Sequence, residues 1–174
     1  MNKNNLTLTV KHDPEPLNPR KDHDNIGTIA AFHSRYAFDE ANLTLEEAQA
    51  LTTDPDYITL PVYMYEHSGI TVSTSPFSCS WDSGQLGVIF TSRLDAHEYL
   101  GRPDTDEEIS KYLEGEVETW ASYLEGEVYS WVIHKGDTFI DACHGYIGEE
   151  EYCRKEGEQM LEHYIAEFDK AQER

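Results

Sequence analysis

The sequence has little positive charge, and least where negative charge is frequent. It holds 13 Lys and Arg against 34 Asp and Glu, a formal net charge of −21. Between Arg35 and Arg93 lie 57 residues without a Lys or Arg but with eight carboxylates. Binding to phosphates depends on clustered Lys and Arg, so direct binding of nucleic acid is disfavoured. The charge favours a basic protein as partner.

Long apolar runs and frequent cysteines are also missing. No run approaches the roughly 18 apolar residues of a membrane span, and Met1–Asn5 leads into an alternating segment rather than a signal peptide. We therefore expect a cytoplasmic protein without a membrane association. Cys79, Cys143 and Cys153 are odd in number and lack metal-ligand spacing, which favours reduced, structural thiols.

Apolar and aromatic residues are frequent enough for a core. At 174 residues, with 39% hydrophobic and 11% aromatic residues, the chain differs from a disordered acidic tail. Neither an internal repeat nor a linker is visible, so we expect one domain over residues 1–174.

Periodicity predicts an α+β fold with an antiparallel sheet of two hairpins plus further strands, and long amphipathic helices packed on it. The proline-rich segment His12–Lys21 is predicted to be a loop, and Gly27–Tyr36 fits a strand or a helix. Pro61 cannot donate a ladder hydrogen bond, which predicts a free side or a bulge at its strand. The predicted strands are Leu6–Lys11, Ile58–Glu66, Ile70–Ser75, Leu86–Thr91, Val128–His134 and Thr138–Tyr146. The predicted helices are Thr44–Leu51, Arg93–Leu100, Asp104–Glu127 and Glu149–Ala171. The first of these helices begins with a capping box between Thr44 and Glu47.

The predicted helix Asp104–Glu127 concentrates acid. It has nine carboxylates and one base, Lys111, over a length of about 36 Å. This is about one carboxylate per 4 Å, which is close to the roughly 3.4 Å between the phosphates of a DNA strand. Five glutamates lie on one third of the circumference of this helix, together with Asp104. These five are the candidate partner-binding residues: Glu107, Glu108, Glu114, Glu118 and Glu125. A merely solvated helix face is the alternative for this helix alone, and a high-salt habitat would explain the overall acidity equally well.

Two residues interrupt the pattern of this helix. Gly115 predicts a kink or a break near Glu114. Glu116 falls on the apolar side, where a carboxylate needs a partner such as a tyrosine hydroxyl, or a raised pKa as in a catalytic acid.

A catalytic alternative comes from the second hairpin. With Lys135-Gly136 as its turn, Glu127 would lie opposite His144 and Ser130 opposite Asp141. His144, Glu127 and Asp141 could then act in general base catalysis, or form ordinary cross-strand pairs.

A divalent metal is the other alternative. His23 and Asp24, in a donor-rich stretch with His12, Asp13, Asp22 and Asn25, could hold an ion, although they lack the EF-hand pattern. No other cofactor is indicated.

The segment Ser73–Gly84 gathers hydroxyls, the thiol of Cys79 and the carboxylate of Asp82 without a nucleophile signature. We expect its hydroxyls to bond to the loop backbone, and Phe77 and Trp81 to anchor the loop on the core.

Four stretches, Asp24–Thr28, Leu60–Thr71, Ser75–Cys79 and Trp81–Gly87, resemble a family of small acidic proteins from bacteriophages and bacterial mobile elements. The resemblance extends over about residues 13 to 147 and carries no catalytic residues. It implies a context in which small accessory proteins counter host defence, including CRISPR nucleases and restriction enzymes.

These observations predict an inhibitor whose acidic surface imitates nucleic acid in the basic channel of a host nuclease. The alternatives are a metal-assisted hydrolase or nuclease acting on RNA or DNA, and an acidic phage structural or regulatory protein without enzymatic activity.

Overall fold

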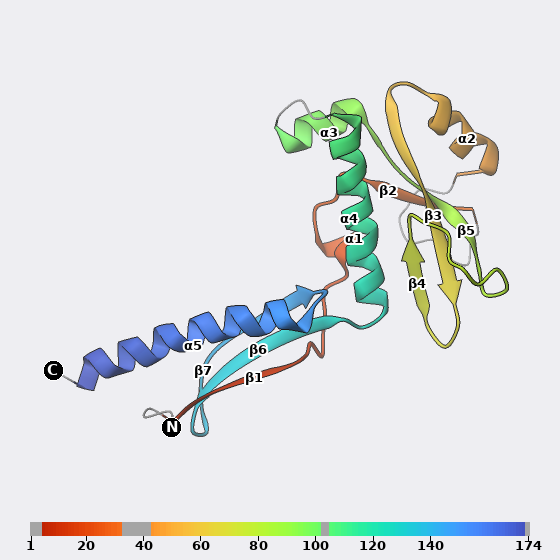
Figure 1. Ribbon diagram of the computed structural model, residues 1–174. Coiled ribbons are helices and arrows are strands. Elements are labelled where there is room, and N and C mark those ends of the chain that lie inside the picture. The colour runs from red at the N-terminus through yellow and green to blue at the C-terminus, as the bar shows by residue number, and fades with distance from the viewer. Residues whose placement is uncertain (1–4, 33–42, 102–104, 173–174) are drawn as a thin grey trace. The chain divides into compact units, whose positions relative to one another are not determined.

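The computed structural model describes residues 5–32, 43–101 and 105–172 (Figure 1). These residues form seven strands in two antiparallel sheets, and five helices, which confirms the α+β class. The two predicted hairpins belong to different sheets rather than to one. The chain divides into two compact units, residues 1–17 with 126–174 and residues 18–125; whether they form the single domain expected stays a prediction.

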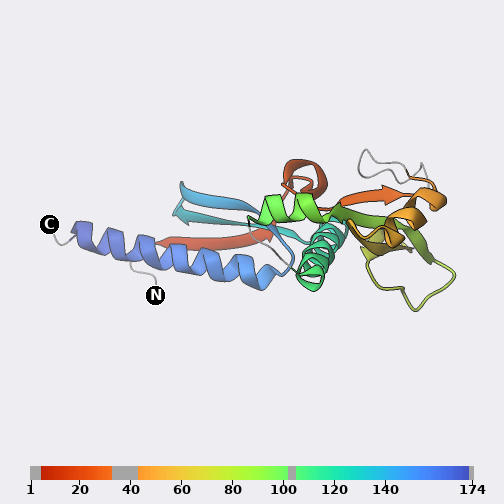
Figure 2. The ribbon, with the colours of Figure 1, turned by 90° about the horizontal axis from the view of Figure 1, so that it is seen from above.

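The first unit is a three-stranded sheet covered by one helix. Its sheet has the order β1 (Leu6–His12), β6 (Val128–Lys135), β7 (Thr138–Ile147), and the helix is α5 (Glu150–Gln172). Figure 2 shows α5 running along the sheet. Buried residues of β1, β6 and α5 form its core: Leu6, Trp131, Ile133 and Cys153.

The predicted register of the β6–β7 hairpin is wrong. Lys135 pairs with Thr138, so the two turn residues are Gly136 and Asp137, and Gly136 adopts the left-handed φ of 59°. Two irregularities, between Ile133 and His134 and between Tyr129 and Trp131, each add one residue to the offset. Asp141 therefore lies opposite Ile133, not Ser130.

The second unit is built on a four-stranded sheet. The order is β2 (Thr28–Ala31), β5 (Ser83–Ser92), β3 (Tyr57–Glu66), β4 (Ile70–Ser73). Pro61 pairs only with β5, because β4 begins its pairing at Tyr63, and an irregularity follows between Val62 and Tyr63. The predicted free side at this proline is confirmed, whereas the irregularity lies in the middle of β3 and not near its start.

Helices cover both faces of that sheet. Neighbouring residues of β2 and β5 alternate between the faces: Ile29 and Ile89 pack with α4 (Asp106–Leu124), whereas Ala30 and Val88 pack with α2 (Leu45–Thr53). The capping box of Thr44 with Glu47 is present, and α3 (Arg93–Leu100) has the predicted bounds.

Two helices differ from prediction. A short helix, α1 (Pro19–Asp22), interrupts the expected loop, because Asn18 caps it and proline is tolerated at its first position. The helix α4 runs through Gly115 without a break and ends at Leu124, with Glu125 as its cap; Asp104 lies outside the described residues. Within the described part of the chain, no helix is long and apolar enough to cross a membrane.

Candidate functional site

The acidic side of α4 is the first candidate site, and part of its charge is used within the unit. The helix begins with a second capping box, in which Glu108 accepts hydrogen bonds from the backbone and hydroxyl of Thr105 at 2.9 and 3.0 Å. Lys111 donates to Glu107 at 2.8 Å, four residues away, and the contact lowers the pKa of Glu107. Asp106 pairs with Arg93 of α3. The first turn of α4 is thus largely engaged in capping and ion pairs.

The second half of α4 presents free carboxylates. Glu114, Glu118 and Glu125 are exposed, and no described residue forms a hydrogen bond or ion pair with their side chains. Steps of 100° per residue place the three within about 40° of one another, over about 16 Å of helix axis. We call these three residues the acidic row. They are the members of the predicted partner-binding set that keep their charge available.

The density of uncompensated charge is lower than predicted. Along the helix axis Glu118 follows Glu114 by about 6 Å and Glu125 follows Glu118 by about 10 Å, a mean spacing of about 8 Å. The nine carboxylates counted in the sequence include Glu116, Glu107 and Asp106, and each of these has a cationic partner in the structure. The row therefore offers a few separate negative charges at wider spacing than the phosphates of a DNA strand.

Glu116 is a partly buried structural carboxylate. It pairs with Arg20 at 2.8 Å and accepts from the backbone N–H groups of Ile26, at 2.7 Å, and Gly27. Arg20 is 3% exposed and also donates to the carbonyl of Gly27 and to Asn25. Neither of the predicted roles, a tyrosine contact or a catalytic acid, describes this residue. Nothing in the sequence around Arg20 identifies it as the partner of Glu116, because the two residues are 96 positions apart.

The proposed metal ligands His23 and Asp24 lie beside this ion pair. They line a hollow of about 350 Å³ in the second unit. Its other lining residues are Pro19, Asn25, Lys111, Tyr112, Gly115, Glu116 and Thr119. Among the described residues, no group of three or more His, Cys, Asp and Glu is arranged to hold a metal ion. The expected donor cluster is also divided, because Asp13 belongs to the first unit and His23 to the second.

The predicted catalytic group is not assembled as expected. The N–H of Gly148, not His144, bonds to the carbonyl of Glu127, because of the shifted register. His144 instead lies 3.6 Å from Asp13, whose side chain is only 5% exposed and also accepts from the N–H of Gly145 at 3.0 Å. Sequence analysis missed Asp13 as the partner because β1 and β7 are more than 120 residues apart.

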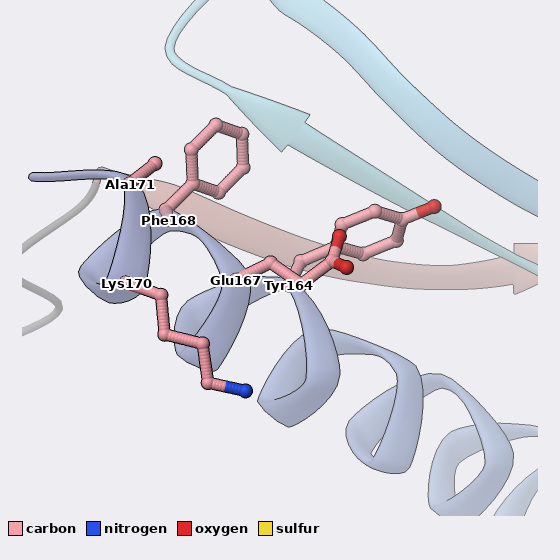
Figure 3. A pocket seen from close by; sticks show the side chains of 5 residues that line it. All are labelled: Tyr164, Glu167, Phe168, Lys170 and Ala171. Atoms are coloured by element: carbon pink, nitrogen blue, oxygen red, sulfur yellow. The ribbon is translucent and has the colours of Figure 1, made fainter. Parts of the chain in front are cut away.

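A second hollow, of about 550 Å³, lies along the end of α5 and is lined by Tyr164, Glu167, Phe168, Lys170 and Ala171 (Figure 3). Tyr164 lines this hollow and donates to Asp141 at 3.0 Å, a bond that raises the pKa of Tyr164. The rings of Tyr164 and Phe168 turn toward the strands, whereas Lys170 points away. Lys135 lies 3.9 Å from the centre of the Phe168 ring. Asp141 is thus occupied as the acceptor of the Tyr164 hydroxyl.

Trp81 contradicts the prediction for the loop between β4 and β5. It is 95% exposed, whereas Trp120 and Trp131 are 1% and 3% exposed. Phe77 alone meets an aromatic neighbour, Tyr65, at 5.6 Å between ring centres. The loop is therefore not anchored by its tryptophan.

Charge is unequally divided between the units. Residues 18–125 hold 20 carboxylates and 6 Lys and Arg, a net charge of −14, while the remaining residues hold 14 and 7, a net charge of −7. Comparison with known proteins adds no assignment: no family model, curated protein or solved structure matches the chain.

Proposed function

We propose that this protein is a binding inhibitor whose second unit occupies the basic nucleic-acid channel of a nuclease, such as a host defence enzyme of the CRISPR or restriction type. The observation that carries the proposal is the acidic row, Glu114, Glu118 and Glu125, exposed and unpaired on a unit of net charge −14. The helix α4 fixes the backbone of Glu114 and Glu118, and Glu125 caps its end, so that only side chains have to be ordered when the row meets a partner.

The physical basis is electrostatic complementarity. A channel that binds nucleic acid is lined with Arg and Lys, and its potential attracts a polyanion from a distance. The carboxylates of the acidic row would pair with such side chains in place of phosphates. Contacts of Glu107 and Glu108 with the nuclease would contribute less to binding, because these two carboxylates already have partners within the unit.

The proposal implies a particular stoichiometry and place of action. An inhibitor of this kind acts at about one molecule per target, needs no cofactor, and works in the cytoplasm where the nuclease works. A metal-dependent enzyme would act below stoichiometry and lose activity with a chelator.

The test is a competition experiment. Tagged protein is incubated with bacterial lysate, and captured proteins are eluted either with duplex DNA or RNA or with rising salt. We expect a nuclease to elute with both, because the nucleic acid competes for the same channel and salt screens the ion pairs. The purified nuclease should then be inhibited by an equimolar amount of the protein.

The double variant Glu114→Lys/Glu118→Lys tests the acidic row. The matched control is Glu158→Lys/Glu162→Lys on α5, which has the same charge change, the same spacing and two exposed positions. We expect at least tenfold weaker inhibition for the first pair and a much smaller loss for the second, since a contact charge contributes more than a distant one. Equal losses for the two pairs would mean that only net charge matters, and would refute the role of the row.

A further inference from the structure

The loop of residues 74–82 connects β4 and β5 (Figure 1). It holds a tryptophan, Trp81, that is 95% exposed. At its start the N–H of Ser75 donates to Ser73 Oγ at 3.0 Å, and at its end the hydroxyl of Ser83 donates to the carbonyl of Cys79. The N–H of Glu66 donates to the carbonyl of Asp82 at 2.9 Å, which fixes the loop to the end of β3. The loop is thus held at both ends while Trp81 points into solvent.

Trp81 has no role in the core. A buried tryptophan would remove a large apolar area from water, and this one remains 95% exposed. Exposed tryptophan on an ordered loop is typical of binding hot spots, because a rigid ring supplies contact area at low entropic cost.

The charge beside Trp81 defines what can bind there. Asp82 follows it directly in the chain, with Nδ1 of His67 at 3.5 Å and Sγ of Cys79 at 3.7 Å from the same carboxylate oxygen. Glu66 lies at the adjacent end of β3, and the whole loop falls within the interval that has no Lys or Arg. An anionic or purely apolar ligand would meet unfavourable charge, whereas a cation is attracted both by the tryptophan face and by the carboxylates.

We infer that this loop is a second contact site for a basic protein partner, in which an arginine of that partner stacks on Trp81 and its guanidinium pairs with Asp82. Arginine fits better than lysine because its planar, weakly hydrated guanidinium stacks on a ring and still donates to a carboxylate at its edge. The inference rests on the proposed function for the kind of partner, but its residues are separate from the acidic row.

Trp81 fluorescence gives a local readout, since the other two tryptophans are buried. The probes are two peptides of equal length and charge, acetyl-(Gly-Arg)5-amide and acetyl-(Gly-Lys)5-amide, at 150 mM salt. We expect the arginine peptide to shift or quench Trp81 emission and to protect it from acrylamide. It should bind roughly two to five times more tightly than the lysine peptide. The Trp81→Phe variant supplies the emission of the buried tryptophans for subtraction.

Labelled peptides and anisotropy then measure affinity in variants. Trp81→Ala and Asp82→Asn should each weaken binding of the arginine peptide by roughly two- to fivefold, and Trp81→Ala should abolish the preference over lysine. Leu94→Ala is the control, because Leu94 is another exposed apolar residue, 74% exposed, on α3. It should leave both affinities unchanged, and the thermal unfolding of all three variants should match that of the parent protein.

Three outcomes would overturn the inference. The first is that Trp81 emission stays unchanged although the peptide binds to the protein. The second is that the parent protein binds the two peptides equally well. The third is that neutral lipid vesicles, or a raised protein concentration without peptide, shift the emission. Loss of binding in Trp81→Ala together with normal inhibition by Glu114→Lys/Glu118→Lys would refute the acidic row and leave the loop site standing. The reverse result would refute the loop site alone.

Discussion

The Arg20–Glu116 pair joins α1 and α4 within the second unit through one nearly inaccessible guanidinium. Removing one member of a buried pair leaves the other charge without compensation, and here two backbone N–H groups lose their acceptor as well.

We expect Glu116→Ala to lower the free energy of unfolding by about 3 kcal/mol or more, measured by urea denaturation. Glu118→Ala, two residues further along the same helix but exposed, should change it by less than about 0.5 kcal/mol. Similar values for the two variants would show that the pair contributes little to stability.

Two groups of the first unit, the buried Cys153 and the half-buried Tyr146, resist ionisation. Burial raises the pKa of the Cys153 thiol to about 11, and it raises the pKa of Tyr146, whose hydroxyl accepts from Trp131 Nε1 at 3.0 Å, to about 12. Their ordinary values are 9.0 and 10.0. The folded state therefore favours the neutral forms.

The sign of the resulting pH dependence is fixed. The contribution of Cys153 to the free energy of unfolding is fully present below pH 9 and is lost as the pH rises toward 11. Ionisation of Tyr146 lowers the free energy of unfolding further, up to about pH 12. We expect the unfolding free energy to fall on the order of 2 kcal/mol over that range for the thiol, and Cys153→Ala to remove this part. A flat profile from pH 9 to 11 in the parent protein would contradict the assignment.

At the scale of the element, the helices α4 and α5 each contain a glycine, in opposite environments. A Cβ at Gly115 would meet nothing within 4 Å. At Gly157 a Cβ would lie 2.8 Å from Leu8 Cδ1 and 3.0 Å from Trp131 Cγ. Gly115 thus lowers the stability of its helix without a packing reason, whereas Gly157 lets α5 approach the sheet.

The same substitution should therefore have opposite effects in the two helices. We expect Gly115→Ala to raise the free energy of unfolding by about 0.5–1 kcal/mol, because alanine is the better helix former. Gly157→Ala should lower it by about 1 kcal/mol or more, since the Leu8 and Trp131 side chains must move. Thermal or urea unfolding of the two variants checks both signs, and a stabilising Gly157→Ala would show that the contact is easily relieved.

Local signals predicted the elements well. The capping box of Thr44 and Glu47 acts within four residues, and Ser92 with Gly101 limits α3 at the bounds that its sequence predicts. The β6–β7 register failed because the turn falls one residue later than predicted and because two irregularities, beside His134 and Tyr129, have no signal in the local sequence.

The candidate site was predicted less well, for a related reason. The acidic helix follows from its composition, but the partners that neutralise Glu116 and Asp106 come from α1 and α3, outside that helix. Trp81 shows the same limit, because its hydrophobicity alone predicts burial, whereas its exposure depends on how the loop is held.

At the scale of the whole molecule, the net charge of −21 produces repulsion that opposes folding. Salt screens this repulsion, and the screening length falls from about 30 Å at 0.01 M to about 3 Å at 1 M.

We expect the protein to be folded at 0.05 M salt, and its melting temperature to rise by several degrees up to about 0.5 M and little beyond, because most repulsion is then screened. Scanning calorimetry across this range is the measurement. A protein that unfolds below molar salt would instead fit the high-salt habitat and weaken the case for an inhibitor.

The path of the chain has a consequence for synthesis on the ribosome. The strand β1 pairs with β6, yet about 120 residues, including the entire second unit, are translated between them. At about 5–20 residues per second the newly made strand waits roughly 6–24 s for its neighbour. The contiguous second unit can complete its sheet during that wait, whereas Leu6–His12 stays available to chaperones until Val128–Lys135 has emerged.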